Sequence, residues 1–263
     1  MTALREADLN TACQQQQLPW QVQVLPQTPS TSDWLRQSAQ TGATSPNVVF
    51  TEIQTSGRGR RENRWQSQPG RDLLFSLLLR PSAPIAHWPR ITTLAALALC
   101  QAIEAELPLA PQIKWPNDIY LSHQKACGLL AETTPTPSGP AIILGIGINV
   151  NSQGFPPELN ATSLLTQLRS QTAIQEIDRN ALALQILQHL HHLLADLSDG
   201  FPAHIQAVRQ RSWLLGRQIR AQVDGQEVFG RAIDLDHEGA LILALPNGDH
   251  RPLTSAENVR AVV

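Results

Sequence analysis

Three turn-forming pairs of residues near the end of the chain constrain the fold most strongly. Asp224-Gly225, Glu238-Gly239 and Asn247-Gly248 each separate two short runs rich in apolar and β-branched residues. Such pairs are typical of tight hairpin turns, because the glycine tolerates backbone angles that other residues avoid. The segment 216–263 is therefore predicted to form a small SH3-like β-barrel, with strands over 219–223, 228–235, 240–245 and 259–263.

The first 215 residues combine helical and extended patterns. A continuous apolar run covers 73–79, and shorter runs at 48–53, 113–121, 127–132 and 141–150 predict further strands. Helical spacing extends over 88–107, 178–197 and 202–213, and hydroxyl residues at 30–32 favour a helix start. Residues 1–27 show little periodicity. We therefore expect an α+β protein with two domains: a larger one over 1–215 with a mixed or antiparallel sheet, and the barrel over 216–263.

Composition excludes several classes of protein. The net charge is −2, so no overall positive field attracts the chain to nucleic acid or to a membrane surface. The N-terminus lacks the apolar segment of a signal peptide, and no apolar run approaches the ~20 residues needed to cross a bilayer. Cys13, Cys100 and Cys127 are far apart, which favours neither disulfides nor a zinc site. We expect a cytoplasmic protein.

The two lysines of the chain lie close together. Lysine and arginine together number 20, and only Lys114 and Lys125 are lysines, which leaves 18 arginines. Lysine is a slim point charge with a pKa that its surroundings can shift, whereas arginine is bulky and always charged. A site that cannot accept arginine is one explanation, and chance in a small sample is another.

A basic loop is the first motif that suggests chemistry. Residues 57–65, Gly-Arg-Gly-Arg-Arg-Glu-Asn-Arg-Trp, contain four arginines, two glycines and one tryptophan. Guanidinium groups bind phosphate oxygens in pairs, glycine lets the backbone approach a ligand, and the indole offers a flat face for stacking. The loop suits a triphosphate or an acyl-adenylate, and a solvated basic loop or a nucleic-acid-binding segment is the alternative.

Two further motifs follow. Lys114-Trp115-Pro116-Asn117-Asp118 and the nearby Lys125 place cations and a carboxylate where an anionic ligand and Mg²⁺ can be held together, although a surface ion pair at a proline turn is commoner. Gly145-Ile146-Gly147-Ile148-Asn149 lacks the third glycine and the helix of a dinucleotide fingerprint. Its two glycines are instead expected to leave one face of a strand open to a ligand, or to allow close packing of a helix.

These three motifs, in this order, resemble those of the biotin–protein ligase family, from about Ser30 to the C-terminus. The resemblance implies a class II synthetase-like catalytic domain followed by the SH3-like barrel. It also implies an ATP-dependent, AMP-forming enzyme that makes biotinyl-5'-AMP and transfers biotin to a lysine of a biotin carboxyl carrier protein. ATP and Mg²⁺ are then required, biotin is a substrate, and no tightly bound prosthetic group is expected.

The resemblance also implies roles for individual residues. Lys125, Arg58, Arg60 and Asp118 are expected to be catalytic, and Asp118 is also the candidate metal ligand. The residues expected to bind biotin are Ser30, Thr31, Gln54, Gly57, Arg58, Lys125, Gly128, Gly145 and Gly147. Those expected to bind ATP are Arg60, Arg61, Trp65, Asn117, Asn149 and Arg260.

The chain departs from the family pattern in three places. Ser32 stands where the family has asparagine, and Glu257 stands three residues before Arg260 where four are expected. The residues before Ser30 are too few for a winged-helix domain. We therefore expect the short, monofunctional class, active as a monomer or homodimer, with no DNA partner. The alternatives are a lipoate or octanoyl protein ligase, a nucleic-acid-binding module, or a biotin binder without catalysis.

Overall fold

The computed structural model describes residues 2–60, 63–170 and 172–262 and contains two β-sheets. The helices are α1 (Glu6–Gln15), α2 (Thr31–Gln40), α3 (Arg90–Glu106), α4 (Leu164–Arg169), α5 (Arg179–Ala195) and α6 (Phe201–Gln210), with short 3₁₀ turns η1 (Ile85–His87) and η2 (Pro157–Leu159). The strands are β1 (Val22–Leu25), β2 (Val48–Thr51), β3 (Leu73–Leu79), β4 (Gln112–Lys114), β5 (Asp118–Leu121), β6 (Gln124–Thr134), β7 (Ala141–Ile148), β8 (Gln218–Val223), β9 (Gln226–Leu235), β10 (Leu241–Ala244), β11 (His250–Leu253) and β12 (Glu257–Ala261).

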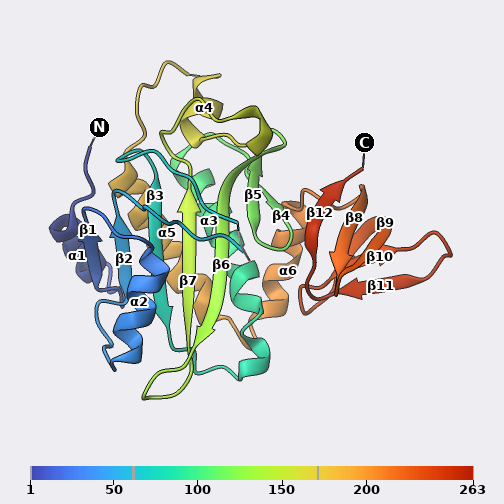
Figure 1. Cartoon of the computed structure of the whole chain (residues 1–263), viewed down its shortest axis with the longest axis horizontal. Helices are drawn as coiled ribbons and strands as arrows, with labels where there is room; N and C mark the ends of the chain where they lie inside the picture. The colour runs from blue at the N-terminus through green and yellow to red at the C-terminus, as the bar shows by residue number, and fades with distance from the viewer. Residues whose placement is uncertain (1, 61–62, 171, 263) are drawn as a thin grey trace.

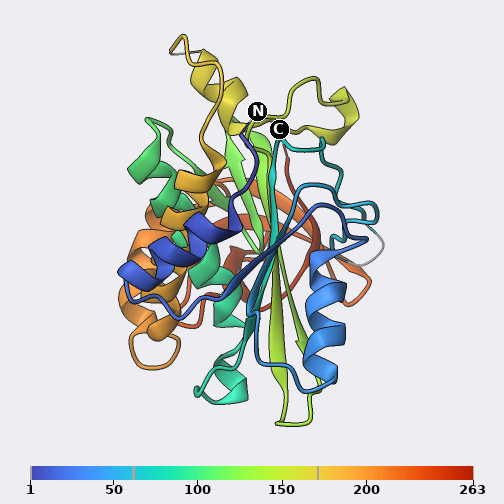
Figure 2. The same cartoon turned by 90° about the vertical axis from the view of Figure 1, so that its left-hand side faces the viewer.

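The large sheet has the strand order β1-β2-β3-β7-β6-β5-β4. Only the β1–β2 pair is parallel, so the sheet is mixed, as the sequence predicts. Figures 1 and 2 show α2 on one face of this sheet and α1, α3 and α5 on the other. The protein is therefore α+β, with helices on both sides of its central sheet.

The two faces of the large sheet carry cores of different size. On the α2 face, Leu35 and Ala39 pack with Val49, Leu78 and Ile143 in a small cluster. On the other face, the apolar residues of α3 pack against α5 and the sheet, and Ile91, Leu94, Leu97, Leu99 and Ile103 are all fully buried. Because the small core covers only part of its face, the rest of that face is available for a site.

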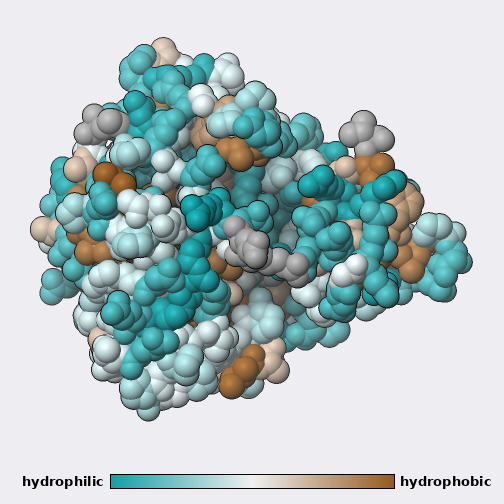
Figure 3. Space-filling view, viewed as in Figure 1, coloured by the Kyte–Doolittle hydropathy of each residue, from teal (hydrophilic) through white to brown (hydrophobic). Residues whose placement is uncertain are grey.

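The second sheet has the order β11-β10-β9-β8-β12 and is antiparallel throughout. The β9–β10 turn fastens it to the larger unit. Arg90 of α3 forms an ion pair with Glu238 in that turn, with a closest N–O distance of 2.7 Å, and the indole of Trp115 donates to the carbonyl of Gly239 at 3.1 Å. These contacts hold the second sheet beside β4 and β5 (Figure 1), and the space-filling view shows the surface of the second sheet continuing into that of the larger unit (Figure 3).

Four elements were not predicted from the sequence. Within 1–27, where little periodicity is visible, the structure forms α1 and β1, and α4 and β11 also went unpredicted. Helix α1 buries only Leu9 and Cys13, which lie one helical turn apart, so its apolar pattern is too sparse to recognise. Strands β1 and β11 have four residues each, and helix α4 has six.

None of the helices in the described part of the chain is both long and apolar enough to cross a membrane.

Candidate functional site

The floor of the candidate site is a glycine patch on the α2 face of the large sheet. Side chains alternate between faces along a strand, so Gly145 and Gly147 of β7 share the face of Ile143, beyond the end of the small core. On β6, Gly128 is paired directly with Gly147. The absence of side chains at these three positions leaves a recess in the sheet surface.

Trp65 fills part of this recess. A Cβ atom at Gly147 would lie 2.5 Å from Cε2 of Trp65, and one at Gly128 would lie 2.9 Å from Cζ3. The loop is fixed here because the amide of Trp65 donates to the carbonyl of Gly57 at 3.0 Å. Among the described residues, the buried indole Nε1 of Trp65 has no hydrogen-bond partner. The glycines at 57, 128 and 147 thus make room for this ring.

A cluster of hydroxyl groups lies beside the glycine patch, where α2 begins. Ser30 caps the helix by accepting from the amide of Asp33, and the hydroxyl of Thr31 lies 2.8 Å from that of Ser76. Gln54 accepts from the amide of Thr31 at 3.0 Å. Ser30, Thr31, Gln54 and the glycine patch line one pocket, here called the hydroxyl pocket. It is lined also by Ser32, Arg58, Arg60, Asn117 and Lys125.

Arg58 is held by two carboxylates at the rim of the hydroxyl pocket. It donates to Asp33 at 2.8 Å and to Glu132 on β6 at 2.7 Å, and Arg36 contacts the same two carboxylates. All four side chains are partly exposed, so each ion pair contributes little stability in water. The network nevertheless fixes the beginning of residues 57–65, here called the arginine loop, against α2 and β6.

Lys125 and Asp118 form an ion pair at the centre of the site. The Nζ atom of Lys125 lies 2.6 Å from Oδ1 of Asp118 and 5.6 Å from the centroid of the Trp65 ring. The two strands β5 and β6 bring these residues together through a hairpin with an irregular register. The Lys125 ammonium is thereby held above the edge of the glycine patch.

The second lysine, Lys114, lies nearby in a less exposed position. Its Nζ atom donates to the hydroxyl of Tyr120 at 2.9 Å, and it lies 4.8 Å from the centroid of that ring. Burial lowers the pKa of Lys114, and the positive charge of Arg260 lowers it further while Asp118 opposes the change. Lys114 was not among the predicted site residues, although it lies in a motif that was.

Tyr120 provides a direct test of these surroundings, because it is the only tyrosine in the chain. Burial, together with the charge of Asp118, raises the pKa of Tyr120 to about 12. We expect the ultraviolet absorbance of the phenolate to appear near pH 12 rather than near the ordinary value of about 10. The stability that Tyr120 contributes is then complete below the unfolded pKa and is lost as pH rises through the folded pKa.

Circular dichroism recorded in parallel separates this titration from alkaline unfolding, and Tyr120→Phe provides the matched control without a phenol. A step near pH 10 in the folded protein would contradict the burial of Tyr120.

A second pocket, here called the Asn149 pocket, opens on the other side of Trp65. One wall consists of residues 63–68, and the other contains Asn149, Ser152, residues 154–156, Leu159 and Ala161. Asn149 donates from Nδ2 to the carbonyl of Thr162 at 3.0 Å. Its Oδ1 is buried and has no hydrogen-bond partner among the described residues. Asn149 therefore places a buried acceptor without a donor at the wall of this pocket.

A third pocket, here called the Arg260 pocket, lies between the two sheets. Arg60 and Arg64 of the arginine loop line it, and so do Lys114 of β4, Lys125 of β6 and Arg260 of β12. Arg60 reaches across the interface, since Nη1 lies 3.2 Å from the carbonyl of Ala256 and 3.4 Å from Oδ1 of Asn117. A pocket lined in this way can hold a polyanion.

The three pockets meet at Trp65 and Lys125, which line all of them. Every predicted site residue within the described chain lies at one of these pockets, except Gly57, which packs against Trp65. Arg61 lies outside the described residues. A molecule with a polar ring at one end, an anionic centre and a heterocycle at the other end can therefore bind across the junction.

Several residues of the site were not found from the sequence. Ser76, which lies 2.8 Å from Thr31 and 2.9 Å from Ser32 in the hydroxyl cluster, carries one signal that was available: it is the only polar residue in the buried run 73–79. Asp33 and Glu132, the partners of Arg58, carry no signal in the sequence, because each is an ordinary charged residue far from Arg58 along the chain.

The described residues include no group of three or more histidine, cysteine, aspartate or glutamate side chains able to hold a metal ion. Asp118 is the one predicted metal ligand, and its buried Oδ1 makes the ion pair with Lys125 without accepting a well-formed hydrogen bond. A single carboxylate suits Mg²⁺ that arrives with a nucleotide, since phosphate oxygens and water then supply the remaining ligands.

Comparison with known families gives two matches. Residues 24–149 match the biotin/lipoate A/B protein ligase family, and residues 214–257 match the biotin protein ligase C-terminal domain. The two segments contain the three pockets between them, apart from residues 150–161 of the Asn149 pocket and a few positions at the end of β12.

Individual proteins are similar over most of the chain. The bifunctional ligase/repressor BirA of Bacillus spizizenii is 36% identical over 225 residues, which is 83% of this chain and 68% of that protein. The biotin–[acetyl-CoA-carboxylase] ligase of Mycobacterium tuberculosis is 31% identical, over 85% of this chain and 83% of its own. The structure of the Aquifex aeolicus biotin protein ligase in complex with biotin and ATP aligns with a TM-score of 0.79 at 25% identity, covering 92% of this chain and 99% of that one.

Proposed function

The chain belongs to the biotin protein ligase family, and from that premise we propose how its own residues carry out the reaction. It is an enzyme that activates biotin with ATP to biotinyl-5'-AMP and then transfers biotin to a lysine of a carboxyl carrier protein. The observation that carries the assignment of residues is the junction of three pockets at Trp65 and Lys125.

The hydroxyl pocket is proposed to hold biotin. The bicyclic ring has a urea group that needs a few fixed hydrogen-bond partners, which Ser30, Thr31 and Gln54 supply beside α2, with Ser76 behind Thr31. The hydroxyl of Ser32 lies 2.9 Å from that of Ser76, so serine can contribute here where the family has asparagine. The apolar chain of biotin then extends over the glycine patch toward Lys125.

The nucleotide is proposed to occupy the other two pockets. The unpartnered Oδ1 of Asn149 matches the 6-amino group of adenine, which needs an acceptor, and the Trp65 ring offers an apolar face beside it. The triphosphate then lies in the Arg260 pocket among Arg60, Lys114 and Arg260. Asn117, which contacts Arg60, completes that side.

The first step joins two anions, so its barrier is mainly electrostatic. An oxygen of the biotin carboxylate attacks the α-phosphorus of ATP, the bond from that phosphorus to the bridging oxygen breaks, and pyrophosphate leaves. Lys125 lies at the junction and offsets the repulsion between the carboxylate and the phosphate. Arg58 and Arg60 close the loop over the reacting atoms and exclude water.

Mg²⁺ is proposed to bind with ATP, with Asp118 as its only carboxylate ligand among the described residues. Bound there, it would neutralise part of the triphosphate charge. The side chain of Asp118 would then be shared between the ion and Lys125.

The second step transfers biotin to the carrier. The neutral amine of the acceptor lysine attacks the carbonyl carbon of the adenylate, an amide bond forms, and AMP leaves with the electrons of the broken carbon–oxygen bond. The acceptor ammonium must first lose a proton. Asp118 is proposed to orient this ammonium by accepting a hydrogen bond from it.

The division of labour is proposed to follow the two sheets. Residues 1–215 form the catalytic domain, and residues 216–263 form the SH3-like barrel that contributes Arg260. The enzyme is proposed to act as a monomer or a homodimer.

The decisive measurement is pyrophosphate release from ATP in the presence of biotin, of lipoate, or of neither. We expect release with biotin alone, followed by labelling of a biotin carboxyl carrier domain on its target lysine. Release with lipoate and not with biotin would assign the chain to the lipoate branch of the family.

Gly147→Ala tests the role of the glycine patch. The added methyl group would overlap Trp65, and overpacking of this kind typically costs 1–3 kcal/mol, so we expect KM for biotin and for ATP to rise about tenfold. Both KM values are measured by pyrophosphate release. In the Trp65→Leu background the same substitution should have a much smaller effect, and equal effects in both backgrounds would contradict the proposed contact.

A further inference from the structure

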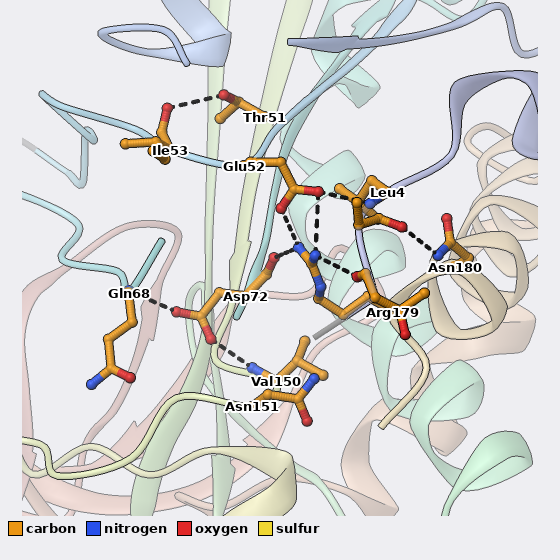
Figure 4. Close-up of polar contacts among 12 residues, drawn as sticks. Leu4, Thr51, Glu52, Ile53, Gln68, Asp72, Val150, Asn151, Arg179 and Asn180 are labelled. Atoms are coloured by element: carbon orange, nitrogen blue, oxygen red, sulfur yellow. Dashed lines mark hydrogen bonds and ion pairs between the residues drawn. The ribbon is translucent and has the colours of Figure 1, made fainter. Parts of the chain in front are cut away.

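A buried carboxylate lies beneath the Asn149 pocket. Asp72 directly precedes β3, and only 2% of its surface is exposed. It accepts three hydrogen bonds: from the amide of Val150 to Oδ1 at 3.0 Å, from the amide of Gln68 to Oδ2 at 3.2 Å, and from the hydroxyl of Ser152 to Oδ2 at 2.6 Å. Figure 4 shows Asp72 between Gln68 on one side and Val150 on the other.

These donors belong to opposite walls of the pocket. Gln68 ends the wall formed by residues 63–68, which continues from the arginine loop. Ser152 lines the other wall together with Asn149, and Val150 lies between these two residues in the sequence. One side chain therefore joins the end of residues 63–68 to the segment that carries the unpartnered acceptor of Asn149.

A second connection between the walls is exposed and weaker. The side chain of Gln68 donates to the carbonyl of Gln153 at 2.6 Å and accepts from its amide at 3.4 Å. Both residues lie at the surface, where water competes for these groups. Of the two connections between the walls, the one made by Asp72 is therefore the buried one.

The position of Asp72 is itself fixed from behind. Its backbone carbonyl accepts from Nη1 of Arg179 at 3.1 Å, and Arg179, which is 1% exposed, forms an ion pair with Glu52 at 2.7 Å. Figure 4 shows Arg179 placed between Glu52 and Asp72. The carboxylate of Asp72 therefore has little freedom to follow either wall if that wall shifts.

We propose that Asp72 is a positioning residue for the nucleotide: its carboxylate sets the separation of the two walls between which the adenine end of ATP binds. The inference rests on the proposed function for the identity of the ligand. A carboxylate is required because all three neighbours are donors and an ionised aspartate only accepts. Asparagine at this position would place its amide N–H groups against one of these donors, or it would leave one of the three donors without an acceptor.

Asp72→Asn tests the proposal through separate calorimetric titrations with ATP and with biotin. Loss of one charge-assisted hydrogen bond between the walls is expected to raise Kd for ATP about tenfold and to leave Kd for biotin unchanged. Release of free biotinyl-adenylate during turnover should also increase, because the loop is less firmly anchored. The matched control is Glu52→Gln, which weakens the buried ion pair in the same cluster but touches neither wall, and which should lower the unfolding midpoint without changing Kd for ATP.

An unchanged Kd for ATP in Asp72→Asn would overturn the proposal, and so would equal losses of ATP and biotin affinity, which indicate general distortion. If Asp72→Asn does not fold, Ser152→Ala serves as the second variant, because it removes one of the three hydrogen bonds to Asp72. It should raise Kd for ATP about threefold, and an unchanged Kd would contradict the proposal. Wild-type protein that binds ATP but releases no pyrophosphate with biotin would refute the proposed function alone, since the ATP titrations still judge Asp72.

Discussion

Lys125→Met is expected to reduce the rate of biotin-dependent pyrophosphate release by about a hundredfold to a thousandfold. Removing a single fixed group that stabilises developing charge in an enclosed site has effects of this size. Lys125 is the cation at the junction of the three pockets, and methionine nearly preserves its length while removing the charge. The measurement is single-turnover formation of biotinyl-adenylate.

Two control variants separate charge from shape. Lys125→Arg keeps the charge, but its larger head must fit over Gly128, where the present Nζ already lies 3.2 Å from an added Cβ, so we expect intermediate activity. Lys114→Met removes the only other lysine, which lines the Arg260 pocket and not the hydroxyl pocket. It should weaken ATP binding more than it slows the chemical step. Full activity of Lys125→Met would refute the proposed role.

Arg179→Met is expected to lower the free energy of unfolding by about 3 kcal/mol, because Arg179 is 1% exposed and its loss leaves Glu52, which is 20% exposed, without its buried partner. Arg179 donates to Glu52, to the carbonyl of Asp72 and to the carbonyl of Thr2. One side chain of α5 therefore joins the residue after β2, the residue before β3 and the N-terminal segment. Urea unfolding followed by circular dichroism measures the loss.

The matched control is Arg211→Met. Arg211 also forms an arginine–glutamate pair, with Glu104 at 2.7 Å, but both side chains are partly exposed, at 23% and 32%. Pairs of that kind contribute at most about 1 kcal/mol. A loss of similar size in both variants would show that the burial of Arg179 does not determine its contribution.

The elements that were predicted correctly are those with dense local patterns. Strand β3 spans 73–79, as expected, because seven mostly apolar residues stand between the charged Asp72 and Arg80. The α+β class and the presence of a separate C-terminal β-sheet follow from patterns of the same kind and are confirmed. The closed, SH3-like form of that second sheet stays a prediction.

The connections among the site residues were not predictable, because they join positions far apart in sequence. Arg58 was expected to face a ligand, yet its two carboxylate partners lie 25 and 74 residues away and follow no motif. Asp72 and Arg179, which are 107 residues apart, were not singled out at all. Motifs identify residues that contact a ligand, whereas the groups that hold those residues in place depend on the three-dimensional packing.

Both lysines line the Arg260 pocket, and the rest of the sequence contains none. Chemical reagents that attack lysine amines therefore have their side-chain targets confined to the place where ATP is proposed to bind. Coupling this protein to a dye or a support through lysine should inactivate it. In most proteins the reagent instead modifies surface lysines without loss of activity. The same property makes protection of Lys114 and Lys125 by bound nucleotide a direct footprint of occupancy, readable by mass spectrometry without any engineered label.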